Sequence, residues 1–288
     1  MPPTRGVMTV LRHRLISAAI GLPIAVALAY IGGLPFAISV CAIAVAGAYE
    51  LMLAMRRAKV EVVKEVAMPC IVIGIMGSYA FANDARSLFL LWCSVAFVLV
   101  FGSMSFHIFA HSDAAQLGGR TVSVCATSFT AAYVCMFSFM VMLRERANGR
   151  ELMLMTLLTV WGADAAAYFI GGKFGGMKIC ERISPGKTIL GSIAGASVAF
   201  LLAPTLTILM RSIPALALNS PTPIEALPIG LIGGIAGQLG DMCKSVIKRD
   251  LNIKDFGAII PGHGGVIDRF DSLLISTPLI YFYAIAIS

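Results

Sequence analysis

The sequence contains 288 residues, of which 58% are hydrophobic and only 13% charged, and its formal net charge is +7 at pH 7. Its mean hydropathy is +0.88, whereas soluble domains are about half apolar and about one quarter charged. This composition excludes a soluble globular protein and predicts an integral membrane protein. Repeated apolar runs, each long enough to cross roughly 30 Å of hydrocarbon as a helix, alternate with short polar segments.

Nine such runs predict an all-α, polytopic integral membrane protein with about nine transmembrane helices. In chain order they cover roughly residues 15–31, 35–55, 66–82, 87–110, 121–143, 151–170, 189–210, 228–247 and 272–288. We interpret the chain as one continuous membrane domain. Its first part, residues 1–120, contains transmembrane helices with little chemistry, and residues 121–288 form a catalytic region.

The distribution of basic residues predicts which side of the membrane the loops face. With nine spans and a cytoplasmic N-terminus, most lysines and arginines fall in cytoplasmic loops, as the positive-inside rule requires. The loop from Arg144 to Arg150 is a local exception. Because the polar loops 171–188 and 248–271 both lie on the cytoplasmic side, we predict a bacterial inner membrane protein whose active site faces the cytoplasm.

The segment from Ser245 to Asp271 concentrates ionisable side chains in an otherwise apolar chain. Charged groups near a membrane are costly unless they are paired, hydrated or metal-bound. The segment mixes four cations with four carboxylates: Lys248, Arg249, Lys254, Arg269, Asp250, Asp255, Asp268 and Asp271. We favour the interpretation that the cations hold anionic substrates and that acidic residues hold a metal.

The candidate metal ligands are three aspartates. Asp268 and Asp271 are spaced i, i+3 at the start of the last apolar run, so both carboxylates lie on one helix face. A divalent cation would remove their repulsion, and the alternative is an acidic first turn that complements the helix dipole. We prefer Asp241, inside an apolar run, as a third metal carboxylate over a structural pair with Lys244 or Lys248.

Further polar residues suit an anionic substrate. Asp164, also inside an apolar run, is either a metal or substrate ligand or the partner in a packing hydrogen bond, and both interpretations stay open. In the Pro-Gly-His-Gly-Gly turn, Gly264 and Gly265 follow His263 and allow backbone amides to approach a phosphate oxygen. Ser245 and Lys248 are expected on the same helix face as Asp241, directed towards phosphate.

The segment 184–188, Ser-Pro-Gly-Lys-Thr, resembles the end of a P-loop, but it lacks the required upstream glycine because position 181 is Glu. It is therefore not a Walker motif. Ser184, Lys187 and Thr188 still suit a polyphosphate or an anionic head group. The alternative is positive-inside charge that touches lipid phosphates.

The stretch from Ser245 to Asp271 resembles the signature of the CDP-diacylglycerol synthase (phosphatidate cytidylyltransferase) family. Its fixed positions are filled here by Ser245, Lys248, Arg249, Lys254, Asp255, Pro261, His263, Gly264, Gly265, Asp268, Arg269 and Asp271. Residues 164–172 and 183–191 are similar to two further family segments. In the second of these, Gly186 replaces a Lys and Leu190 replaces a Glu.

This resemblance implies an enzyme of phospholipid biosynthesis that converts CTP and phosphatidic acid into CDP-diacylglycerol and pyrophosphate with Mg²⁺, or Mn²⁺ in its place. The expected catalytic residues are Asp241, Lys248, Arg249, His263, Asp268, Arg269 and Asp271, of which the three aspartates bind the metal. The expected substrate-binding residues are Asp164, Ser184, Lys187, Thr188, Ser245, Lys254, Asp255, Gly264 and Gly265. Membrane lipids are expected partners, nucleic acid is not, and a homodimer is an expected assembly.

Two other classes of function are compatible with parts of the pattern. A CTP-dependent polyprenol or dolichol kinase, or a polyprenyl-phosphate sugar-phosphate transferase, would also be polytopic with acidic metal sites, but the complete signature disfavours both. An ion or metabolite transporter would use Asp164 and Asp241 as coupling sites. The concentration of charge on one face and the lack of a visible inverted repeat disfavour a transporter.

Overall fold

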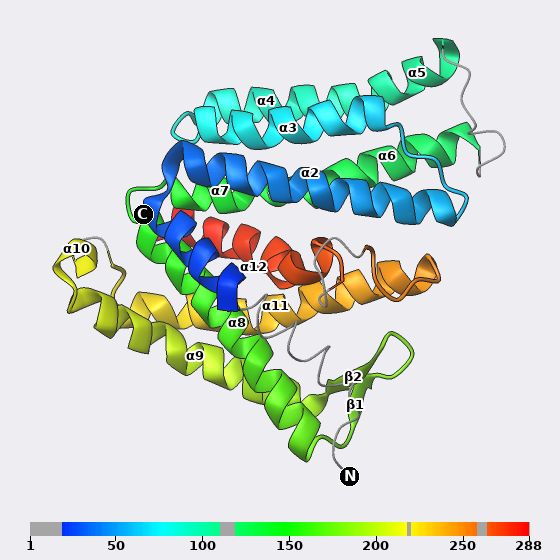
Figure 1. The fold of residues 1–288 in the computed structure, drawn as a ribbon. Coiled ribbons are helices and arrows are strands. Elements are labelled where there is room, and N and C mark those ends of the chain that lie inside the picture. Colours follow the sequence, from blue (N-terminus) through cyan, green and yellow to red (C-terminus); the bar gives the residue numbers. More distant parts are fainter. Residues whose placement is uncertain (1–18, 110–118, 218–219, 258–263, 288) are drawn as a thin grey trace. The chain divides into compact units, whose positions relative to one another are not determined.

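A computed structural model describes residues 19–109, 119–217, 220–257 and 264–287, and most of its regular structure is helical (Figure 1). Within these residues, six helical stretches are long and apolar enough to cross a membrane: Gly33–Arg57, Ala85–Phe109, Arg120–Arg144, Gly149–Phe174, Ile189–Arg211 and Pro223–Asp250. The predicted all-α, multi-pass membrane class is therefore confirmed. The count of nine spans is not confirmed. The apolar helix Ala19–Ile31 is shorter, α3 (Lys64–Ala80) has 17 residues, and the helix Ile267–Ala286, which contains most of the last predicted span, is not among the six.

The chain forms two compact units, and both are discontinuous in sequence. One comprises Met1–Ser138 with Asp250–Arg269, and the other comprises Phe139–Arg249 with Phe270–Ser288. We call them the first and the second unit. The predicted division of the sequence near residue 120 stays a prediction about where the chemistry lies.

The first unit is built on helices that pack through small and branched apolar side chains. Besides the helix Ala19–Ile31, it contains α2 (Gly33–Arg57), α3, α4 (Ala85–Phe97), η1 (Val98–Gly102), α5 (Ser103–Phe109) and α6 (Arg120–Cys135). Helix α3 packs against α2, α4 and α6 (Figure 1). Ala44 and Ala48 of α2 and Ile71 and Ile75 of α3 are fully buried, so apolar side chains of both helices form the core of this unit.

The second unit contains the remaining helices and a small hairpin. Its elements are α7 (Ser138–Arg144), α8 (Gly149–Phe174), β1 (Lys178–Cys180), β2 (Ser184–Thr188), α9 (Ile189–Arg211), α10 (Pro214–Ala217), α11 (Pro223–Asp250) and, from Phe270 onward, α12 (Ile267–Ala286). Helices α8 and α9 run side by side (Figure 1).

Glycines permit the close approach of α8, α9 and α11. A Cβ atom added at Gly195 of α9 would lie 2.7 Å from the carbonyl oxygen of Ala163, and one added at Gly234 of α11 would lie 2.8 Å from the Cα of Ala196. Both distances are too short for real atoms. Small residues on facing helices are the usual basis of close helix packing in membranes, and here they bring the polar ends of three helices together.

The segment predicted to resemble a P-loop end forms β2, which pairs with β1 in an antiparallel hairpin. Lys178 lies opposite Thr188 and Cys180 opposite Ser184, with an irregular register between them. Thr188 then caps α9, since its side-chain oxygen accepts a hydrogen bond from Gly191 N at 3.1 Å. This hairpin joins the end of α8 to the start of α9 and fixes where Lys187 emerges.

Candidate active site

The centre of the candidate site is Asp241 on α11, which binds two lysines. Lys244, one turn further along the same helix, places its Nζ 2.6 Å from Asp241 Oδ1. Lys187, the fourth residue of β2, places its Nζ 2.8 Å from Asp241 Oδ2 and donates a hydrogen bond to the Gln238 carbonyl oxygen at 2.8 Å. Asp241 is thus held between a lysine of its own helix and a lysine of the hairpin.

Lys244 extends the cluster to α12. Its Nζ lies 2.5 Å from Asp271 Oδ2, so one ammonium group bridges two carboxylates from different helices. Both of these residues are buried, and a buried charge is tolerated only when it is paired. We name Lys187, Asp241, Lys244 and Asp271 the acid–base cluster; its two lysines and two aspartates balance in formal charge.

The cluster depends on the contact between α11 and α12 at Gly240. A Cβ atom added there would collide with the backbone carbonyl of Asp271 and would lie 3.2 Å from the Cα of Ser272. Glycine at this position therefore lets the two helices approach closely enough for Lys244 to reach Asp271.

Asp164 of α8 joins the same region through a hydrogen bond. Ser272 Oγ of α12 donates to Asp164 Oδ2 at 2.9 Å. Of the two interpretations left open by the sequence, the structure contains the packing hydrogen bond between helices. Because Ser272 follows Asp271 directly, this bond also fixes the orientation of the first turns of α12.

A second group of polar contacts lies in the first unit, around Asp268. Its Oδ2 atom accepts hydrogen bonds from Phe256 N at 3.2 Å and from Gly265 N at 3.1 Å. The neighbouring residue Val266 donates its backbone amide to Glu50 Oε2 of α2 at 2.6 Å. The carboxylates of Glu50 and Asp268 therefore accept hydrogen bonds from backbone amides on both sides of residues 258–263.

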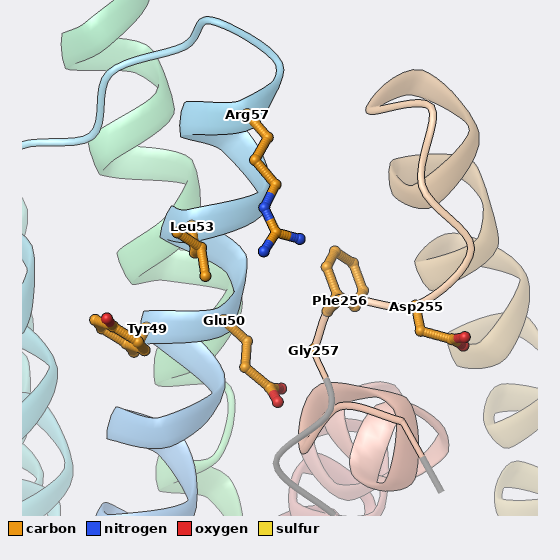
Figure 2. A pocket seen from close by; sticks show the side chains of 7 residues that line it. All are labelled: Tyr49, Glu50, Leu53, Arg57, Asp255, Phe256 and Gly257. Atoms are coloured by element: carbon orange, nitrogen blue, oxygen red, sulfur yellow. The ribbon is translucent and has the colours of Figure 1, made fainter. Parts of the chain in front are cut away.

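A pocket of about 300 Å³ adjoins these contacts (Figure 2). One wall is α2 and the other is the segment that follows α11, and the lining residues are Tyr49, Glu50, Leu53, Arg57, Asp255, Phe256 and Gly257. Figure 2 shows Glu50 and Arg57 extending from α2 towards the segment that carries Phe256 and Gly257.

The predicted phosphate-binding cations are accessible. The side chains of Arg249, Lys254 and Arg269 are exposed and Lys248 is half-buried. Arg249 Nε donates to the Ile183 carbonyl oxygen at 3.2 Å, which ties the end of α11 to the hairpin. The roles of all four in binding phosphate stay predictions.

The other predicted substrate-binding residues have varied surroundings. Ser245 donates its hydroxyl to the Asp241 carbonyl oxygen at 2.8 Å. Ser184 is half-buried and Asp255 is exposed. Gly264 has a φ of +82°, a left-handed conformation that favours glycine. His263 lies outside the described residues, together with Pro261.

The structure brings together two of the three predicted metal carboxylates. Asp241 and Asp271 converge on one cation, the Lys244 ammonium group, whereas Asp268 binds backbone amides in the first unit. Within the described part of the chain, no three His, Cys, Asp or Glu side chains are grouped so as to hold a metal ion. Both of the converging carboxylates are paired with the Lys244 ammonium group, and their binding of Mg²⁺ stays a prediction.

Sequence reasoning missed two residues of these sites. The sequence suggests Lys244 only as a structural partner of Asp241, although its i, i+3 spacing places it on the same helix face. Glu50 lies in the half of the chain that was predicted to hold little chemistry. An ionisable residue inside an apolar helix is by itself a signal of function, and this signal was present in the sequence.

Replacing Gly240 by alanine is expected to destabilise the protein by about 1 to 3 kcal/mol, the usual cost of overpacking. The added methyl group would force α12 away from α11. The measurement is thermal unfolding of the purified protein in detergent. Gly172→Ala is the matched control, since a Cβ at Gly172 meets nothing within 4 Å. Equal melting temperatures for both variants would contradict the close contact.

Comparison with known proteins gives one family and several relatives. The model of a family described as the cytidylyltransferase family matches residues 12–287. A phosphatidate cytidylyltransferase of Bacillus subtilis (strain 168) is 28% identical over 288 residues, which cover 96% of this chain and 98% of the relative. A phosphatidate cytidylyltransferase of Brucella melitensis biotype 1 is 37% identical over 135 residues, 47% of each chain.

A third relative, the uncharacterized protein YnbB of Escherichia coli (strain K12), is 34% identical over 176 residues. The match covers 61% of this chain and 54% of YnbB. The chain thus matches the Bacillus relative over nearly its whole length, whereas it matches the other two over about half of theirs.

Proposed function

Because this chain belongs to the cytidylyltransferase family, we propose that it transfers CMP from CTP to phosphatidic acid and so produces CDP-diacylglycerol and pyrophosphate. The observation that carries the proposal is the complete signature from Ser245 to Asp271 together with the acid–base cluster, which joins Asp241 and Lys244, just before the signature, to Asp271 at its end and to Lys187 of the hairpin. The nearly full-length match to a phosphatidate cytidylyltransferase supports the same substrates. The kinase and transporter alternatives are not favoured by these relatives.

The proposed reaction needs no protein nucleophile. A phosphate oxygen of phosphatidic acid forms a bond to the α-phosphorus of CTP, and the bond from that phosphorus to the bridging oxygen breaks to release pyrophosphate. Catalysis then consists of positioning two anionic substrates and stabilising the charge on the leaving group. These tasks require cations in fixed places and a polar site at the membrane surface.

The acid–base cluster suits these tasks. Asp241 holds the ammonium groups of Lys187 and Lys244 in fixed positions. The Lys187 side chain is the more exposed of the two, at 18% against 11%, and it would contact a phosphate oxygen. Asp241 and Asp271 would hold Mg²⁺, or Mn²⁺, which when bound would stabilise negative charge on the triphosphate. The exposed side chains of Arg249, Lys254 and Arg269 would add further contacts to phosphate.

The protein is a multi-pass integral membrane protein, and we place it in a bacterial inner membrane with its active site facing the cytoplasm. Helix α9 supports this orientation. It has 23 residues, or about 34 Å at 1.5 Å per residue, enough to cross the hydrocarbon. Its first end adjoins the basic hairpin, and its other end leads to α10, so the two ends face opposite sides.

A pair of single cysteines tests this orientation. Met177 before α9 and Ser212 after it are both exposed. In an active background without the native cysteines, we expect Met177→Cys to react with a membrane-impermeant maleimide only after the cells are opened. Ser212→Cys should react in cells whose outer barrier alone is permeabilised. The reverse pattern would place the site on the outer side, away from cytosolic CTP.

The proposed activity is tested with purified protein, CTP and phosphatidic acid in detergent micelles. The expected result is pyrophosphate release that requires both substrates and Mg²⁺ or Mn²⁺, with CDP-diacylglycerol formed in equal amount. Transfer to a polyprenol in place of phosphatidic acid, or solute transport without pyrophosphate release, would support one of the alternatives.

A further inference from the structure

Glu50 is a buried acidic residue in the apolar helix α2, and the sequence of α2 does not explain why a carboxylate is placed there. It lies within Gly33–Arg57, a candidate membrane span, and is only 2% exposed. A buried carboxylate in such a place is costly unless it is bound by donors. Its position therefore points to a partner outside α2.

That partner is the backbone just before α12. Val266 N donates to Glu50 Oε2 at 2.6 Å across 216 positions of sequence. Val266 immediately precedes the first residue of α12, and its carbonyl oxygen accepts from Arg269 N at 3.0 Å. The amides at the start of a helix have no partner within the helix, and a negative charge there is favoured by the helix dipole. Glu50 thus acts on α12 as a capping carboxylate supplied by another helix.

Two glycines next to the Glu50 carboxylate leave the space that it occupies. A Cβ atom added at Gly265 would lie 2.6 Å from Glu50 Oε2, and one added at Gly257 would collide with the same carboxylate. One turn before Glu50, a Cβ atom added at Gly47 would lie 2.9 Å from Cγ1 of Ile267. Gly47 and Glu50 share one face of α2. This face therefore contacts both the turn before α12, through Glu50, and Ile267, the first residue of α12, at Gly47.

We propose that Glu50 is a positioning residue, which fixes the turn at 264–266 and with it the start of α12. Asp268 holds the same turn from within α12 by accepting from Phe256 N and Gly265 N. The two carboxylates together bind three backbone amides on both sides of residues 258–263. The first turn of α12 contains Asp268 and leads to Asp271, and both are residues of the proposed reaction. The expected kinetic effect of Glu50 therefore rests on the proposed function.

The test combines hydrogen–deuterium exchange with kinetics on the full-length protein. Glu50→Ala removes the acceptor, whereas Glu50→Gln keeps a side-chain oxygen at the same distance from α2 without the charge. The exposed residue Glu65, in the first turn of α3, provides the matched control Glu65→Gln. Exchange is measured in peptides that cover 264–270 and, for comparison, in peptides of α3 and α9.

In Glu50→Ala we expect exchange in 264–270 to be about ten- to a hundredfold faster, since a charge-assisted hydrogen bond to Val266 is lost. Exchange in α3 and α9 should not change. The kcat should fall about tenfold, while the KM values for CTP and phosphatidic acid change less than about threefold. Glu50→Gln should lie between Glu50→Ala and the wild-type protein, and Glu65→Gln should equal the wild-type protein.

Two results would overturn the inference. Unchanged exchange in 264–270 of both Glu50 variants would remove the link between Glu50 and the turn. Equally accelerated exchange in α3 and α9 would make Glu50 a general stabilising residue. If the wild-type protein did not convert CTP and phosphatidic acid, the proposed function would fail, and the exchange measurement would still decide the role of Glu50.

Discussion

Changing Asp271 to asparagine is expected to reduce CDP-diacylglycerol formation at least about a hundredfold, with normal membrane insertion. Asparagine keeps the size of the side chain but removes the charge that balances Lys244 and that would hold Mg²⁺. Loss of one preorganised electrostatic group in an active site commonly costs about a hundred- to a thousandfold in rate. Insertion should survive, because neutralising a buried acid lowers the cost of its burial.

The measurement is the rate of product formation over a range of Mg²⁺ concentrations, with Asp268→Asn examined beside Asp271→Asn. Asp250→Asn provides the control, since Asp250 is an exposed residue at the end of α11. If Asp268 is a third metal carboxylate, its variant should need more Mg²⁺ as well. Wild-type rates with an unaltered Mg²⁺ dependence in Asp271→Asn would refute the assignment of this residue.

The second large effect is expected at Lys244. Its side chain is 11% exposed, and its Nζ lies within 2.6 Å of carboxylate oxygens of both Asp241 and Asp271. Lys244→Met would leave the two carboxylates facing each other without the intervening cation. Removing one partner of a buried ion pair costs about 3 to 5 kcal/mol, so the variant should unfold at a clearly lower temperature.

Thermal unfolding in detergent measures this effect, and Lys173→Met serves as the control because Lys173 is exposed in the last turn of α8. The double variant Lys244→Met with Asp271→Asn should lose less stability than the two single variants added together, because the repulsion is relieved. Additive losses in the double variant, or equal melting of Lys244→Met and Lys173→Met, would show that the bridge contributes nothing to stability.

The membrane fold was predictable because apolar runs report directly on helices that meet lipid. The number of spans was not, since a run such as Lys64–Ala80 is close to the minimum length for crossing. Whether a marginal helix crosses the bilayer depends on its tilt and on its neighbours, which the run itself does not encode.

The site was predictable in its residue types but only partly in its contacts. The sequence indicated Asp241, Asp268 and Asp271 as metal ligands, and the structure joins two of them, Asp241 and Asp271, through Lys244. Lys187 contacts Gln238, which is 51 positions away in the sequence, and this contact depends on where the hairpin places Lys187. Likewise, the contact of Glu50 with Val266 spans 216 positions. Such pairings arise from tertiary packing, and the local pattern around Glu50 contains only the signal of a buried charge.

The most direct test of the central claim follows each phosphate of CTP separately. Purified protein is incubated with phosphatidic acid, Mg²⁺ and CTP that carries a radioactive label in either its α- or its γ-phosphate, and the lipid and aqueous products are separated. Transfer of CMP predicts that the α label appears in the lipid product and that the γ label appears in pyrophosphate. A γ label in the lipid, with CDP released, would mean kinase chemistry and would contradict the account, as would the absence of both labels from the lipid.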